Sequence, residues 1–88
     1  MWIIKNLATV KAKTWDGQER LVQKAELRAE LDGNHGIFFK IEGRYENQTF
    51  MIDYFVDRVK AIDEYNQLMQ RLIIEQERYL EDYVENYF

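Results

Sequence analysis

Residues 50–73 read FMIDYFVDRVKAIDEYNQLMQRLI, and the spacing of the apolar side chains changes within this stretch. Up to residue 56 an apolar residue falls at every second position, which is the period of a β-strand with one buried face. We therefore predict a strand over residues 50–56. Its inward side chains are expected to be Phe50, Ile52, Tyr54 and Val56, and its outward side chains Met51, Asp53 and Phe55.

From Asp57 onward the apolar residues recur at steps of three and four, the period of an α-helix. Asp57 is a suitable N-cap, although Asp53 or Val56 would shift the start. Neither proline nor glycine occurs between residues 57 and 88. We predict a helix over 57–88, roughly 30 residues and about 45 Å long. The recurring residues are Val59, Ile62, Tyr65, Met69, Leu72, Ile73, Gln76, Leu80, Tyr83 and Tyr87.

Alternation also describes the chain before residue 50, where we predict strands over 4–13 and 37–45. Gly43 interrupts the apolar row of the second of these, which indicates a bulge or a close approach of another residue. The inward residues are expected to be Ile4, Ala8, Val10 and Ala12 in the first strand, and Ile37, Phe39, Ile41 and Tyr45 in the second.

Residues 18–31 support two interpretations. Good helix formers are frequent there, and Asp16 with Glu19 resembles a capping box. However, on a helix Leu27 would point away from Leu21, whereas a strand separates two rows of side chains. The inward row is Leu21, Ala25, Leu27, Ala29 and Leu31, and the outward row is Val22, Lys24, Glu26, Arg28 and Glu30. Because periodicity is a stronger signal than propensity, we predict one strand.

The loops follow from keeping all apolar residues on one face of the sheet. A two-residue turn at Asp16-Gly17 pairs Ala12 with Leu21, and one at Asn47-Gln48 pairs Tyr45 with Phe50. For the middle hairpin, pairing Leu31 with Ile37 would create three cross-strand pairs of like charges, and such pairs destabilise a sheet. We therefore predict a three-residue loop, Asp32-Gly33-Asn34, that pairs Leu31 with His35.

These elements predict an α+β fold: a four-stranded antiparallel β-meander followed by one long C-terminal α-helix packed on one sheet face. Eighty-eight residues suit one domain, with residues 1–56 forming the sheet and 57–88 the helix. No apolar stretch approaches the roughly 20 residues of a membrane span. The absence of cysteine excludes disulfides and thiolate metal sites, and it favours a cytoplasmic location.

The net charge of −4 is concentrated at one end of the chain. Residues 1–74 carry as many basic as acidic side chains, whereas residues 75–88 carry Arg78 and five acidic residues. A net basic surface is typical of nucleic-acid-binding proteins, so binding to nucleic acid is not expected. Acidic side chains also oppose the macrodipole at the C-terminus of a helix.

The predicted helix is longer than the predicted strands, which span about 23–30 Å. The C-terminal half of the helix is therefore expected to project from the sheet with apolar residues that have little of the sheet to pack against, which favours an interface with another chain. A homodimer is the simplest partnership; the alternative is a bend near Gln76 that returns the tail to its own domain. The expected interface residues are Tyr79, Leu80, Tyr83, Val84, Tyr87 and Phe88.

We expect the chain to be a non-enzymatic protein–protein interaction module that binds its partner through the C-terminal half of the helix. Its size suits a phage or mobile-element accessory protein. The alternative is a small acidic inhibitor that occupies a basic or nucleic-acid-binding site on a target enzyme. In either case the acidic contacts are expected from Glu77, Glu81, Asp82 and Glu85.

No catalytic, cofactor or metal site is predicted. His35 is the single histidine and lies in a predicted turn, and the chain contains no serine. A weak acid–base candidate is the set Glu26, Glu42 and Asp53 on the outer sheet face. A weak RNA platform is Phe38 with Phe55 among basic residues, which the neighbouring carboxylates neutralise.

Overall fold

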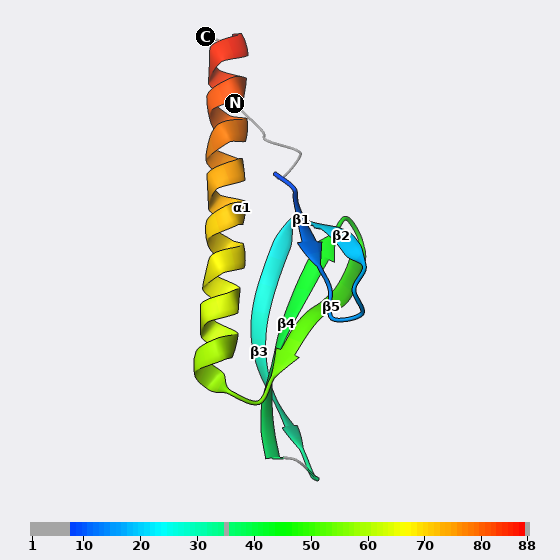
Figure 1. The fold of residues 1–88 in the computed structure, drawn as a ribbon. Coiled ribbons are helices and arrows are strands. Elements are labelled where there is room, and N and C mark those ends of the chain that lie inside the picture. Colours follow the sequence, from blue (N-terminus) through cyan, green and yellow to red (C-terminus); the bar gives the residue numbers. More distant parts are fainter. Residues whose placement is uncertain (1–7, 35, 88) are drawn as a thin grey trace.

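The computed structural model of the chain describes residues 8–34 and 36–87, and for residues 79–87 the backbone alone. The described residues form five strands and one helix (Figure 1). In chain order these are β1 (Val10–Lys13), β2 (Glu19–Val22), β3 (Lys24–Asp32), β4 (Gly36–Tyr45), β5 (Gln48–Phe55) and α1 (Arg58–Tyr87).

The strands form two antiparallel sheets, one of β1 and β2 and one in the order β3-β4-β5. The α+β class with one C-terminal helix is confirmed. The single four-stranded meander is wrong, because the predicted strand over 18–31 is divided into β2 and β3 by a bend at Gln23.

The bend at Gln23 changes which residues face the core. Val22 is completely buried whereas Leu21 is 39% exposed, the reverse of the predicted alternation. Ala25 and Leu27 contact the core from β3, so the inward positions Val22 and Ala25 are three residues apart. One residue is therefore inserted into the alternation at the bend.

The first hairpin also contains one residue more than predicted. Thr14 and Gln18 close a three-residue loop: the Thr14 N–H donates to the Gln18 carbonyl over 2.8 Å, and the Gly17 N–H donates to the Thr14 carbonyl over 2.9 Å. Gly17 has φ of 83°, which a glycine adopts at low cost after a tight turn. The predicted pairing of Ala12 with Leu21 is wrong, since Ala12 lies opposite Arg20.

In the second hairpin Leu31 lies opposite Ile37, so the predicted pairing with His35 is wrong. The loop does hold three residues, one position later, between Asp32 and Gly36; His35 itself lies outside the described residues. Three ion pairs offset the like charges that face each other directly. Lys40–Glu30 at 2.6 Å and Arg28–Glu42 at 3.5 Å join diagonal neighbours, and Lys40–Glu42 at 3.0 Å joins two residues of β4.

The third hairpin turns at Glu46-Asn47, one residue before the predicted loop, and pairs Tyr45 with Gln48. The register then shifts beside Ile41 and Glu42, which leaves Ile52 as the extra residue of a β-bulge. Beyond the bulge the alternation along β5 is reversed. Phe55 contacts the core, whereas Tyr54 and Val56 are exposed, so the predicted faces of these three residues are wrong.

Helix α1 and the β1–β2 hairpin contact the same core of the three-stranded sheet (Figure 1). Apolar residues from all three parts are buried there: Val10, Ala12, Val22, Ile41, Ile52, Leu68 and Leu72. The helix begins as predicted, because the Asp57 carboxylate accepts a hydrogen bond from the Val59 N–H over 2.9 Å.

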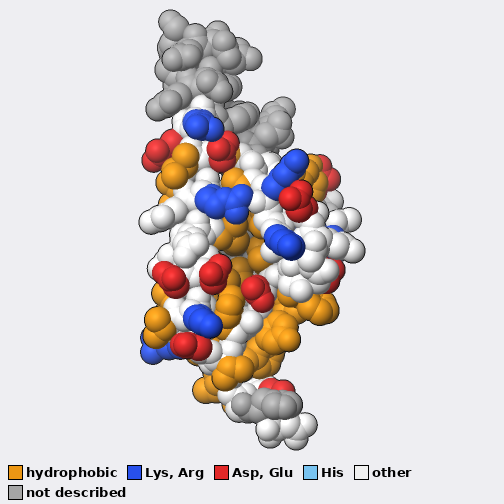
Figure 2. All heavy atoms as spheres, in the orientation of Figure 1, with side chains coloured by type: hydrophobic (Ala, Val, Ile, Leu, Met, Phe, Trp, Pro, Cys, Tyr) orange, Lys and Arg blue, Asp and Glu red, His pale blue; other side chains and the backbone are white. Residues whose placement is uncertain are grey.

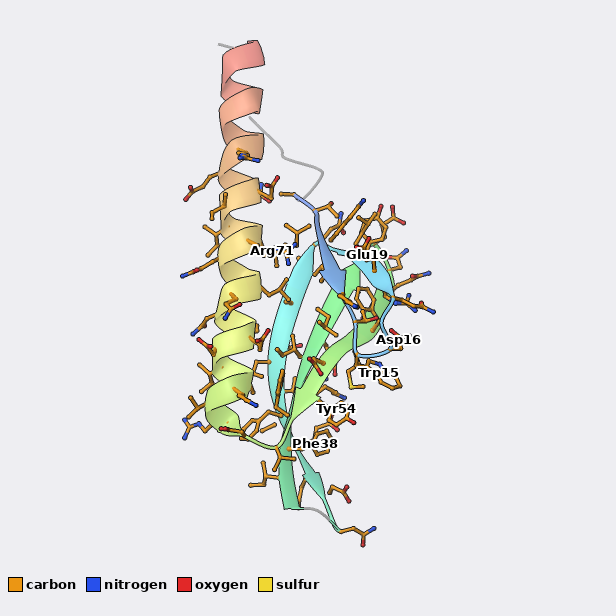
Figure 3. The ribbon with its side chains drawn as sticks, in the orientation of Figure 1. Trp15, Asp16, Glu19, Phe38, Tyr54 and Arg71 are labelled. Atoms are coloured by element: carbon orange, nitrogen blue, oxygen red, sulfur yellow. The ribbon has the colours of Figure 1, made fainter. Side chains whose placement is uncertain are left out.

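Two polar contacts tie α1 to the first hairpin. The Arg71 guanidinium, which points from α1 toward β1 in Figure 3, donates to the Lys11 carbonyl. The Gln76 side-chain carbonyl accepts a hydrogen bond from the Ala8 N–H over 2.9 Å. Both contacts use backbone groups of the segment around β1, so they do not depend on its side chains.

Gly43 provides a test of the packing beside the bulge. A Cβ at this position would lie 2.7 Å from Ile52 Cδ1 and 2.9 Å from Phe50 Cε2. We predict that Gly43→Ala lowers the free energy of unfolding by about 1–3 kcal/mol, measured by urea denaturation. Gly33→Ala is the matched control, because nothing lies within 4 Å of its Cβ position; equal stability of the two variants would contradict the predicted close approach.

Candidate interaction surfaces

Helix α1 carries two apolar stripes. The inner stripe, formed by Ala61, Tyr65, Leu68 and Leu72, faces the core. The second, which we call the outer stripe, follows steps of three and four along a different side of the helix. It consists of Val59, Ile62, Asn66, Met69, Ile73 and Gln76.

Three apolar members of the outer stripe are open to solvent. Val59 is 74% exposed, Ile62 is 37% exposed and Ile73 is 52% exposed, whereas Met69 is partly covered by the core. At about 100° per residue, Ile73 lies about 160° around the helix from Arg71, the residue that contacts β1. Except at Gln76, whose side chain bonds to the Ala8 N–H just before β1, the outer stripe therefore lies on the flank of α1 that the first hairpin leaves open.

The last turns of α1 project past the strands. The helix is one continuous element of 30 residues, and Figure 1 shows no bend near Gln76. The long axis of the molecule is 56 Å, about twice its other dimensions of 26 and 24 Å. Residues 77–87 of this projection, which we call the tail, have no described strand beside them in Figure 1.

The predicted interface residues Tyr79, Leu80, Tyr83, Val84 and Tyr87 are in the tail, where the backbone is helical and the side chains lie outside the described part. Phe88 lies outside the described residues altogether. Of the predicted acidic contacts, Glu77 is exposed, and Glu81, Asp82 and Glu85 belong to the same undescribed set of side chains. The outer stripe continues into the tail without a change of spacing, through Leu80, Tyr83 and Tyr87.

A second apolar surface, at the opposite end of the molecule, was missed by the sequence analysis. Leu31 and Ile37 lie opposite each other near the tip of the β3–β4 hairpin, and Leu31 is 81% exposed. Val56 and Val59, at the start of α1, are also exposed. We call these four residues the apolar end; Figure 2 shows hydrophobic side chains gathered toward the lower end of the molecule.

The apolar end arises because the β3–β4 hairpin extends past the start of α1 (Figure 1). Leu31 and Ile37 have the parity of the core-facing residues Leu27 and Ile41, but no described element lies over them. The hydrophobic pattern gives no signal for this offset between hairpin and helix, and the predicted register wrongly paired Leu31 with His35 instead of Ile37.

The outer face of the three-stranded sheet is charged. Lys40 lies between Glu30 and Glu42, and Glu42 also contacts Arg28. The hydrogen bond from Lys40 holds the pKa of Glu42 below its usual value of 4.5, and Arg28 adds to this effect. The hydrogen bonds to Glu30 and Glu42 raise the pKa of Lys40. This arrangement is a neutralised surface network and not a poised acid–base pair.

The two weak chemical candidates are not assembled by the fold. Glu26 and Glu42 lie opposite each other on the outer face, but Asp53 pairs with the core residue Ile41 and lines a separate cavity of about 220 Å³ beside α1. The proposed RNA platform also loses a member, because Phe55 contacts the core. Phe38 stays near the hairpin end of the sheet, close to Tyr54 in Figure 3.

The described residues include no group of three histidine, cysteine, aspartate or glutamate side chains that could hold a metal ion. Within the same part of the chain, no helix is long and apolar enough to cross a membrane. Comparisons with models of protein families, with curated proteins and with solved structures find no match for this chain. The surfaces themselves are therefore the basis for assigning a function.

The charged network makes a prediction about acid stability. A lowered pKa in the folded state means that Glu42 contributes stability above pH 4.5, which is lost as the pH falls through its folded-state pKa. We predict that in Glu42→Gln the free energy of unfolding falls less steeply below pH 4.5 than in the unmodified chain, as measured by urea denaturation at a series of pH values.

Glu64→Gln is the control, because Glu64 is exposed on α1, away from this network, and forms no ion pair with a described residue. Below pH 4.5 the free energy of unfolding of this variant should fall as steeply as that of the unmodified chain. If the free energy of unfolding of Glu42→Gln falls as steeply below pH 4.5 as that of the unmodified chain, the network contributes nothing to stability.

Proposed function

We propose that this chain is a non-enzymatic protein–protein interaction module that self-associates through α1. The observation that carries the proposal is the outer stripe, which is exposed at Val59, Ile62 and Ile73 and runs along the helix beside a complete inner stripe. A helix that only covers its own sheet needs one apolar stripe. A second stripe with exposed isoleucine and valine favours a partner.

The spacing of the outer stripe supports pairing with another helix. Steps of three and four are the repeat that lets two helices interlock their side chains along a common seam. The stripe begins at Val59 in the first turn of α1 and keeps this spacing to Tyr87 in the last turn. The seam therefore has the full length of the helix, about 45 Å, whereas the strands support only part of it.

Polar residues in the stripe make the association selective. Asn66 is exposed within the stripe, and Gln76 is partly occupied by its bond to Ala8. A polar residue in a helical seam lowers stability but restricts the register and the number of chains. Such a seam suits a defined dimer better than a large assembly.

The second candidate function is that of an acidic inhibitor that binds a basic site on a target enzyme. The observation that favours it is the location of the net charge: the chain is neutral up to residue 74, and the excess of four negative charges lies after it. Of these residues, Glu75 contacts Arg78 at 3.3 Å and Glu77 is exposed. Binding to a basic partner that weakens steeply with added salt would support this candidate.

Two neighbouring isoleucines provide a matched test of self-association. Ile73 belongs to the outer stripe, and Ile74 is equally open to solvent at 54% exposed but lies about 100° further around the helix. We predict that Ile73→Asp raises the dissociation constant of the dimer by at least about tenfold, because it places a charge in an apolar seam. Sedimentation equilibrium measures the effect.

Ile74→Asp should leave the dimer intact, and circular dichroism should show that both variants remain folded. If the unmodified chain is monomeric, or if the two variants dissociate equally, self-association along the outer stripe is refuted.

A further inference from the structure

We infer that two copies of this chain pair with their α1 helices antiparallel, so that the tail of each copy covers the apolar end of the other. This inference rests on the proposed self-association and specifies the arrangement of its partner. It commits to a second copy of the chain as the occupant of the apolar end, which comprises Leu31, Ile37, Val56 and Val59.

The first argument is that the molecule has one overhang at each end. The tail of α1 extends past the strands at one end, and the β3–β4 hairpin extends past the start of α1 at the other (Figure 1). Turning a second copy by 180° places its tail beside the hairpin of the first copy and its hairpin beside the first copy's tail. One two-fold axis therefore covers both overhangs in both copies, which is a closed, isologous arrangement.

The second argument is the position of the outer stripe relative to the axis. Ile73 lies within one residue of the midpoint of α1, which spans Arg58–Tyr87. Full antiparallel overlap of the helices therefore places Ile73 near the axis, opposite its own counterpart. The exposed Val59 and Ile62 of one copy then lie opposite the tail of the other.

The third argument is charge. Residues 57–74 carry three acidic and three basic side chains, whereas residues 75–88 have a net charge of −4. A parallel pair would place the two acidic segments side by side, and like charges on adjacent surfaces oppose association. An antiparallel pair places each acidic segment beside a neutral one, and it also sets the two helix dipoles in opposite directions.

A parallel pair would have one compensating feature, because it would align Asn66 with its counterpart. It would, however, leave the apolar end of both copies exposed, since the two tails would then be adjacent to each other. Of the two arrangements, only the antiparallel one brings a tail to the end of the partner where Leu31 is 81% exposed and Val56 is 75% exposed.

The chain has no cysteine, so introduced thiols report the arrangement directly. We would prepare two single-cysteine variants of the whole chain, Asp63→Cys and Glu81→Cys, and label one with ¹⁵N. Asp63 is exposed and lies outside the outer stripe, so its replacement leaves the seam unchanged. Each variant alone and an equimolar mixture would be treated with a short bismaleimide reagent and analysed by mass spectrometry. In an antiparallel pair centred near Ile73, residue 63 of one copy lies close to residue 81 of the other.

The expected result is efficient cross-linking in the mixture, giving a product that contains one copy of each variant, and little product from either variant alone. The two copies of residue 81 would be separated by about 24 Å along the helix axis, beyond the reach of a short reagent. Cross-linking of Glu81→Cys alone, as efficient as in the mixture, would overturn the antiparallel arrangement. A monomer in sedimentation equilibrium would instead refute self-association itself, so the two failures are distinguishable.

A second measurement concerns Leu31, a residue of the apolar end that belongs to β3 and lies outside the helix seam. Leu31→Ser should raise the dissociation constant of the dimer by about tenfold, because a partly buried leucine contact is lost in each copy. Tyr54→Ser is the matched control: Tyr54 is also an exposed strand residue, but it lies on the outer sheet face. Equal dissociation constants for the Leu31→Ser variant and the unmodified chain would show that the tail does not cover the apolar end.

Discussion

The bend at Gln23 is the constraint on which the rest of the structure depends. The Gln23 N–H donates to the Arg44 carbonyl over 2.8 Å, and the Gln23 side-chain carbonyl accepts from the Glu46 N–H over 2.9 Å. These two bonds fasten the junction of β2 and β3 to the end of β4. The chain can therefore leave the three-stranded sheet and return over its inner face, where Val22 becomes the most buried residue of the hairpin. Without the bend, that part of the core would be open to solvent.

The sequence predicts the elements well and their registers poorly, for one physical reason. Side chains alternate strictly along a strand, so a single inserted residue moves every later side chain to the other face. Such insertions occur at the Gly17 turn, at Gln23 and at Ile52. Each is stabilised by backbone hydrogen bonds or by a partner strand, and none of the three can be recognised in the hydrophobic pattern. The helix is continuous and contains no inserted residue, so its period predicted it correctly from the N-cap at Asp57 to its last turns.

The second hairpin shows how a sound rule can select the wrong register. Direct like-charge pairs are unfavourable, and Arg28 does lie opposite Lys40. However, long side chains reach their diagonal neighbours, and Glu42 is close to both cations. The energy of a charged sheet face therefore depends on the whole network. The adopted register also pairs Leu31 with Ile37, which are apolar and exposed, and neither pattern nor charge predicts that a hairpin will extend beyond its covering helix.

The candidate surfaces follow from this offset between the helix and the sheet. A helix rises about 1.5 Å per residue and a strand about 3.3 Å, so a 30-residue helix and strands of eight to ten residues differ in length by more than 10 Å. The sequence predicts this difference in length, but it does not predict at which ends of the molecule the surplus helix and the surplus sheet project. Had α1 been centred on the sheet, both its ends would project and the hairpin would be covered. Because α1 instead begins short of the hairpin tip, the surplus helix and the surplus sheet lie at opposite ends, and each is the kind of surface that the other could cover.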